Sequence, residues 1–160
     1  MPPPEVLALI SELQRLREAF AGATPRQRFL VGLDRVNNPD AYPNDLVTRV
    51  SAIEAFARSL VANSHVGSRT EVIVKHRRLE KREAHHLVAA YLKLHCLEPR
   101  NHFGEQVWET FRAAVGARNL LVHECTYLDA QKYLPMADAC TEVLFALARL
   151  SRIRLPKSAA

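Results

Sequence analysis

Glycine and long apolar runs are both scarce in this chain of 160 residues, and each absence argues against a class of fold. Only five glycines occur, and no segment alternates apolar with polar side chains as a half-buried strand does, which disfavours a β-rich fold. No apolar run approaches the roughly 20 residues that a membrane-spanning helix needs. Residues 1–30 lack a charged start followed by an apolar block, so we expect neither a secretory signal nor a membrane partner.

Cysteine is also rare, and a disulfide framework is not expected. The three cysteines are odd in number and far apart in the sequence: Cys96, Cys125 and Cys140. This usage favours a reducing compartment, and we predict a cytoplasmic protein. The composition, 48% hydrophobic and 24% charged, is typical of one soluble globular protein.

Motifs for metals and nucleotides are missing as well. The sequence contains no Cys-x-x-Cys pair, no glycine-rich phosphate loop and no nucleophile elbow. His85-His86, His95-Cys96 and His102 raise zinc as an alternative, but the helical positions of the first three histidines do not obviously converge. We therefore predict no metal and no cofactor.

Apolar residues recur with helical spacing from end to end, which predicts an all-helical protein. We expect helices over residues 6–20, 44–61, 69–97, 103–123 and 129–152, with a short helix around Gln27 to Val36 inside a connector over 23–44. The chain then divides into an N-terminal helix with its connector, a helical domain and a flexible tail, over residues 1–43, 44–152 and 153–160.

Basic charge is concentrated in the middle of the chain. Residues 65–118 hold 10 Lys and Arg against 6 Asp and Glu, and the run "KHRRLEKR" occupies residues 75–82. Such a run could bind RNA phosphates, and the candidate contacts are Lys75, Arg77, Arg78 and Lys81. The alternative is a solvated helix face on which Glu71, Glu80 and Glu83 pair with these bases.

The segment "GARNLLVHE", residues 116–124, places Arg118 five residues before His123. The spacing alone is weak, because Arg69 with His76 and Arg78 with His85 satisfy the same loose pattern. The surrounding sequence distinguishes Arg118 and His123 from these other pairs. The polar residue Asn119 directly follows Arg118, an apolar run leads on to His123, and an amphipathic helix with Trp108 and Phe111 precedes the segment. We expect these two aromatic side chains in the core or in an interface.

The longer segment "VWETFRAAVGARNLLVHECTYLD", residues 107–129, resembles the signature helix of the HEPN superfamily. The likeness in pattern extends over roughly residues 44–152. It implies an up-and-down bundle of four to five main helices, here with an extra N-terminal helix. In catalytic members it implies a metal-independent endoribonuclease that acts as a homodimer, with Arg118, Asn119 and His123 at the matching positions.

The residue types suit that chemistry. The imidazole of His123 titrates near neutrality and could move the proton of a ribose 2′-hydroxyl, while the guanidinium of Arg118 could hold the phosphate. The expected products carry 2′,3′-cyclic phosphate and 5′-hydroxyl ends. Five helical residues rotate by about 500°, which leaves the two side chains some 140° apart. A helix kink, a helix end or a partner chain must therefore bring them together, and Asn119 could orient the imidazole.

Two further residues are candidates for support. Glu54 lies beside the apolar stripe of its helix and could pair with Arg118, although a surface carboxylate is the favoured interpretation. Within the superfamily the motif looks most like that of HepT-type toxins, in which a Tyr lies two residues after the His and is modified by a nucleotidyltransferase antitoxin. Cys125 occupies that position here, and Tyr127 follows two residues later.

Three functions stay open at this point. The first is the HEPN-type ribonuclease, as a toxin with an antitoxin or nucleotidyltransferase partner, an antiviral defence factor or an RNA-processing enzyme. The second is a non-catalytic module of the same fold that binds RNA, nucleotide or protein. The third is a helical interaction protein or DNA-binding regulator that uses residues 75–82.

Overall fold

The computed structural model describes residues 1–21, 27, 42–65, 67–126 and 128–153. Within these residues the regular structure is helical with no strand, which confirms the all-helical prediction. The described helices are α1 (Pro4–Ala21), α3 (Tyr42–Ala62), α4 (Arg69–Leu79), α5 (Ala84–Leu94), α6 (Pro99–Phe103), α7 (Glu105–His123) and α8 (Ala130–Leu150). None of them is both long enough and apolar enough to cross a membrane.

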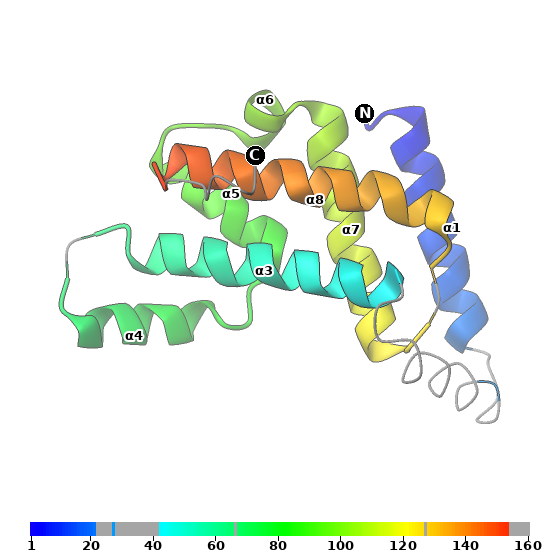
Figure 1. Cartoon of the computed structure of the whole chain (residues 1–160), viewed down its shortest axis with the longest axis horizontal. Helices are drawn as coiled ribbons and strands as arrows, with labels where there is room; N and C mark the ends of the chain where they lie inside the picture. The colour runs from blue at the N-terminus through cyan, green and yellow to red at the C-terminus, as the bar shows by residue number, and fades with distance from the viewer. Residues whose placement is uncertain (22–26, 28–41, 66, 127, 154–160) are drawn as a thin grey trace.

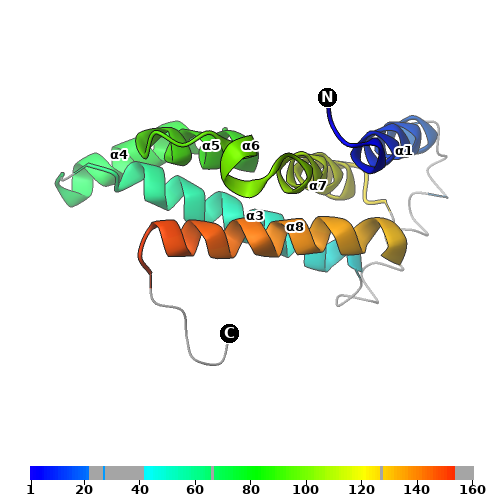
Figure 2. The same ribbon diagram turned by 90° about the horizontal axis from the view of Figure 1, so that it is seen from above.

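Helix α3 is the centre of the packing. It contacts α4, α5, α7 and α8, and α7 also packs on α8 and on α1. Figure 1 shows α3 and α8 alongside each other, with α7 crossing behind them and α1 on the outer side of α7. Seen from above, α8 lies on one side of a row formed by α5, α6, α7 and α1, below it in the picture (Figure 2). Helix α7 thus packs against α1, α3, α5, α6 and α8.

The apolar stripes that the sequence predicts for the long helices form the core. On α3 the fully buried residues follow helical spacing: Leu46, Val50, Ile53 and Ala57. Phe111 is the largest fully buried side chain, and it lies on α7 facing this core. Burial of these apolar side chains away from water supplies the main stabilisation of the bundle.

The prediction of one helix over residues 69–97 is wrong, because the chain breaks between α4 and α5. A capping box between Ser68 and Glu71 starts α4, which buries no residue. By contrast, α5 buries an apolar face that includes Leu87 and Leu92. The polar residues 80–83 offer nothing apolar to bury, so the chain turns there and brings α5 onto the core, while α4 packs on α3 without burying a residue.

A short helix and a glycine separate α5 from α7. Pro99 begins α6, where its missing N–H costs nothing, and the Glu98 side chain accepts from the Asn101 N–H. The sequence-based prediction instead ended a helix here and missed α6. Gly104 has φ of 88°, a backbone conformation that side chains disfavour, and it separates α6 from α7.

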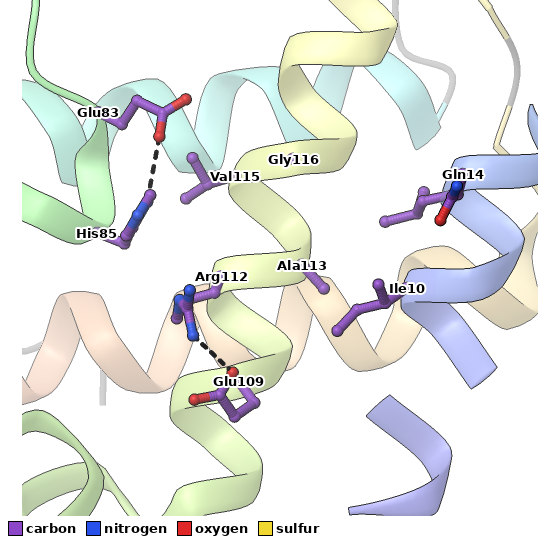
Figure 3. Close-up of a pocket in the computed structure, with 10 residues that line it drawn as sticks. Ile10, Gln14, Glu83, His85, Glu109, Arg112, Ala113, Val115 and Gly116 are labelled. Atoms are coloured by element: carbon purple, nitrogen blue, oxygen red, sulfur yellow. Dashed lines mark hydrogen bonds and ion pairs between the residues drawn. The ribbon is translucent and has the colours of Figure 1, made fainter. Parts of the chain in front are cut away.

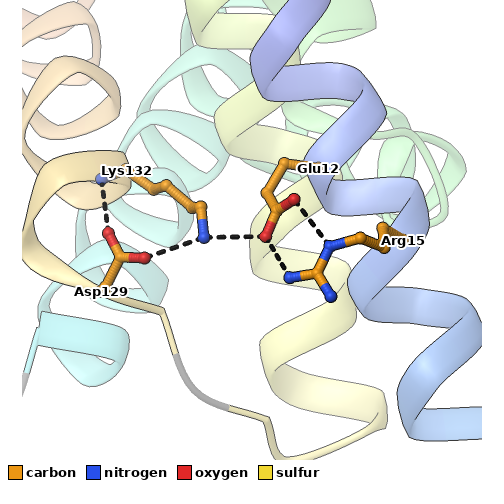
Figure 4. A network of polar contacts seen from close by, with 4 residues as sticks. All are labelled: Glu12, Arg15, Asp129 and Lys132. Carbon is orange, nitrogen blue, oxygen red and sulfur yellow. Dashed lines mark hydrogen bonds and ion pairs between the residues drawn. The ribbon is translucent and has the colours of Figure 1, made fainter.

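The N-terminal helix joins the same packed body. Val6 on α1 is 2% exposed, and α1 packs on α7. A polar bridge also ties α1 to the start of α8: Lys132 Nζ lies 2.9 Å from Glu12 Oε1 and 2.8 Å from Asp129 Oδ2, and Arg15 donates to Glu12 (Figure 4). The connector helix expected around Gln27 to Val36 lies outside the described residues, apart from Gln27.

Candidate functional site

The predicted catalytic residues lie in the last two turns of α7. The helix continues without a break from Glu105 to His123, and Glu124 caps it. Cys125 then adopts φ of 49°, a left-handed conformation that turns the chain toward α8. The helix therefore ends directly after His123, and no kink lies between Arg118 and His123.

Arg118, Asn119 and His123 border one surface cleft of about 290 Å³. Glu54 contributes from α3, and the turn between α4 and α5 supplies the remaining lining residues. The turn residues that line the cleft are Glu80, Lys81, Arg82 and Glu83. A single chain thus brings together the three residues that the motif singles out, together with cationic side chains from a segment over 30 residues away in sequence.

Arg118 is held by an ion pair with Glu54. Arg118 Nη2 donates to Glu54 Oε2, and the two side chains are only 19% and 18% exposed. The favoured interpretation of Glu54 as a surface carboxylate is therefore wrong, and its alternative pairing with Arg118 is the observed one. The other oxygen of Glu54 accepts from Arg58 Nη2 at 2.7 Å. Sequence reasoning missed Arg58, although its position one turn after Glu54 was a signal.

Asn119 makes its own connection across the cleft. Its Nδ2 donates to Glu83 Oε1 at 2.9 Å, so the amide nitrogen is engaged by the turn before α5. The idea that Asn119 orients the imidazole of His123 stays a prediction. Glu83 is a site residue that sequence reasoning had considered only as a partner for the basic run.

His123 lies exposed at the edge of the cleft. No hydrogen bond joins its imidazole to any of the described residues. The neighbouring Val122 is also exposed, at 50%. The imidazole is therefore accessible to a ligand or to a second chain.

The four predicted RNA contacts do not gather in one place. Lys81 lines the cleft, beside Arg82, which was not predicted. Lys75 and Arg78 line a separate hollow of about 450 Å³ with His65. Arg77 borders neither of these and is exposed on α4. The structure therefore places one predicted RNA contact beside Arg118 and the other three along α4.

Cys125 and Tyr127 follow the motif, and only Cys125 belongs to the described residues. Cys125, at the position where a HepT-type motif has Tyr, is half-buried. Tyr127, the other candidate, lies outside the described residues.

A larger cavity of about 590 Å³ lies on the other side of Glu83, between α1, α5 and α7 (Figure 3). It contains Glu109, a carboxylate that is 2% exposed and accepts from Arg100 at 2.8 Å and from Arg112 at 2.9 Å. His85 also borders it, and burial, together with the adjacent His86, lowers the pKa of its imidazole. Sequence reasoning missed this buried charge pairing, which joins α6 to α7.

No protein-family model, no curated protein and no solved structure matches this chain. Function must therefore be inferred from the residues of the cleft and their geometry.

Proposed function

We propose that this protein is a metal-independent endoribonuclease with a HEPN-like helical fold. The observation that carries the proposal is the shared cleft of Arg118, Asn119 and His123. An exposed imidazole and a guanidinium at one cleft can supply both requirements of RNA cleavage by the 2′-hydroxyl, namely proton transfer and neutralisation of phosphate charge.

In the proposed reaction, His123 accepts the proton of the ribose 2′-hydroxyl while that oxygen attacks the neighbouring phosphorus. The bond from phosphorus to the 5′-oxygen breaks, and the leaving oxygen takes up a proton from an imidazolium, so that the number of protons is unchanged. Arg118 binds the phosphoryl oxygens, whose charge grows in the transition state. The products are a 2′,3′-cyclic phosphate and a 5′-hydroxyl, and no metal or cofactor takes part.

The ion pair with Glu54 prepares Arg118 for this role. Because Glu54 lies between Arg58 and Arg118, one carboxylate restrains two guanidinium groups, and the trio keeps one net positive charge. A restrained guanidinium loses little conformational freedom when it binds phosphate. Lys81 and Arg82 of the turn between α4 and α5 add positive charge to the same cleft, where they would bind the flanking RNA backbone.

A homodimer completes the proposal. His123 and Val122 are both exposed at the end of α7, and a two-fold axis beside this end would place two His123 and two Arg118 side chains around one substrate. The biological settings that suit such an enzyme are a toxin with an antitoxin or nucleotidyltransferase partner, antiviral defence, or RNA processing.

The direct test incubates purified protein with tRNA and single-stranded RNA in EDTA. We expect cleavage by the wild type and a loss of at least about 100-fold in rate for Arg118→Ala and for His123→Ala, because removing a group that acts in the transition state costs several kcal/mol. Arg149→Ala and His95→Ala serve as matched controls, since both residues are exposed and outside the cleft.

The competing function is a non-catalytic RNA-binding module. The engagement of Arg118 by Glu54 gives it some support, because a paired arginine can be purely structural. It predicts RNA binding by the wild type and by His123→Ala, with no cleavage by either protein. That result would refute the ribonuclease proposal.

A further inference from the structure

A second cluster of chemically active side chains lies at the N-terminus of α5, outside the catalytic proposal. Glu83, His85 and His86 each offer a ligand atom, and these three atoms lie within 4.8 Å of one another. The rings of the two histidines are 4.0 Å apart between centroids. The expectation that the histidines of this segment do not converge is therefore wrong for His85 and His86.

Two donor atoms of this cluster have no hydrogen-bond partner of their own in the α5 N-terminus, although Glu83 Oε1 accepts from Asn119. Glu83 is the N-cap residue of α5, yet its side chain makes no capping hydrogen bond. His85 Nδ1 is buried without a hydrogen-bond partner. A buried polar atom with no partner costs free energy, so His85 Nδ1 gains by binding a ligand that reaches it.

The separation of the two best-placed donors suits one metal ion. His85 Nδ1 lies 3.7 Å from Glu83 Oε2, which is too far for a hydrogen bond. Two ligands of a tetrahedral zinc ion, each bound at about 2.0–2.1 Å, lie about 3.4 Å apart. A small side-chain adjustment would therefore allow both atoms to bind the same ion, and exposed His86 is close enough to supply the third ligand.

The surroundings leave room for a fourth ligand. Glu83 and His85 border the 590 Å³ cavity, from which a water molecule could complete the coordination. Two charged groups from α7 face His85: the Arg112 guanidinium opposes a cation, and the Glu109 carboxylate, 2.9 Å from Arg112, offsets it. Figure 3 shows Glu83 and His85 facing each other above this pair.

We infer that Glu83, His85 and His86 form a binding site for a divalent transition-metal ion of the zinc class. Two imidazoles and one carboxylate with an open fourth position are a ligand set that zinc commonly takes. The site is separate from the proposed RNA chemistry, which needs no metal. It is nevertheless adjacent to the cleft, because Glu83 also accepts the hydrogen bond from Asn119.

The test titrates Zn²⁺ into the full-length, untagged protein after chelator treatment, using isothermal calorimetry. We expect one ion per chain and a loss of affinity on the order of tenfold or more for Glu83→Gln, His85→Ala and His86→Ala, since each removes one of three protein ligands. His102→Ala is the matched control. A Cys96→Ser variant excludes binding at the exposed His95-Cys96 pair.

Two further measurements keep the result interpretable. Circular dichroism melts establish that each variant folds, and His86→Ala changes an exposed residue that the core does not need. Co²⁺ in place of Zn²⁺ should give the visible absorption of a tetrahedral nitrogen and oxygen site in the wild type, and not in His86→Ala. Absence of Zn²⁺ binding, or binding that all three substitutions leave unchanged, would overturn the inference.

Discussion

Arg118 on α7 and Glu54 on α3 are joined by an ion pair between residues 64 positions apart in the sequence. Both side chains are less than one-fifth exposed, and Arg58 binds the other carboxylate oxygen. This relationship fixes where the candidate catalytic arginine lies, because α7 and α3 are both held by the core. In the proposed ribonuclease Glu54 would be a positioning residue, since it would act through Arg118.

Replacement of Glu54 by Gln should therefore affect both stability and activity. The change leaves two partly buried guanidinium groups without a carboxylate, and we expect a loss of about 1–3 kcal/mol in the free energy of unfolding, measured by urea denaturation. RNA cleavage should fall mainly through kcat. Glu54→Asp should recover part of both effects, whereas Glu142→Gln, at an exposed position on α8, should alter neither. An unchanged kcat in a folded Glu54→Gln protein would show that Arg118 needs no such restraint.

The residues that line the cleft predict which basic side chains contact substrate. Lys81→Ala should weaken RNA binding and reduce the slope of log affinity against log salt by about 0.7, the change expected for one phosphate contact on a single strand. Arg77→Ala is the comparison, because Arg77 lies on α4 and borders neither hollow. Filter-binding titrations at several salt concentrations measure both. Equal losses for the two variants would indicate binding along α4 in place of binding through the cleft.

A composite dimer site predicts complementation between inactive chains. If Arg118 of one chain acts with His123 of another, a mixture of Arg118→Ala and His123→Ala proteins contains heterodimers with one intact pair of residues. Activity should then rise well above that of either variant alone after the two are unfolded and refolded together. If each chain acts alone, the mixture stays inactive, and the dimer part of the proposal fails.

Acid should weaken the bridge that ties α1 to α8. Hydrogen bonds from Arg15 and Lys132 lower the pKa of Glu12 from 4.5 to about 2. A carboxyl group whose pKa is lower in the folded state stabilises the fold above its unfolded pKa, and this stabilisation is lost as the pH falls from about 4.5 toward 2. Urea midpoints of the wild type should therefore fall more steeply over this range than those of Glu12→Gln. Parallel curves would mean that the bridge does not form in solution.

The elements that sequence patterns predict well are those whose signal is local. The stripe at Leu46, Val50 and Ile53 repeats with helical spacing and is buried as expected. The Arg118 to His123 segment is equally local, and its residues do border one cleft. By contrast, the break between α4 and α5 is set by tertiary packing, because α5 buries an apolar face against the core and α4 buries no residue.

The partners of the motif could not be predicted with equal success for the same reason. Glu83 meets Asn119 across 36 positions and was not predicted, and the pairing of Glu54 with Arg118 across 64 positions was raised only as the less favoured alternative. No periodic pattern records such pairings, because they arise only when α3, α5 and α7 pack together. The approach of His85 to His86 was also missed: successive helical side chains normally diverge, yet here both lie in the first turn of α5 next to Glu83.

The central claim is that the ribose 2′-hydroxyl attacks the phosphate with help from His123. The most direct measurement compares, in EDTA, single-turnover cleavage of an RNA oligonucleotide with cleavage of the same strand carrying a 2′-deoxy sugar at the scissile position, with mass spectrometry of the ends. The account predicts cyclic phosphate ends from the RNA, no cleavage at the deoxy position, and loss of the reaction in His123→Ala. Cleavage at the deoxy position, or full activity of His123→Ala, would contradict it.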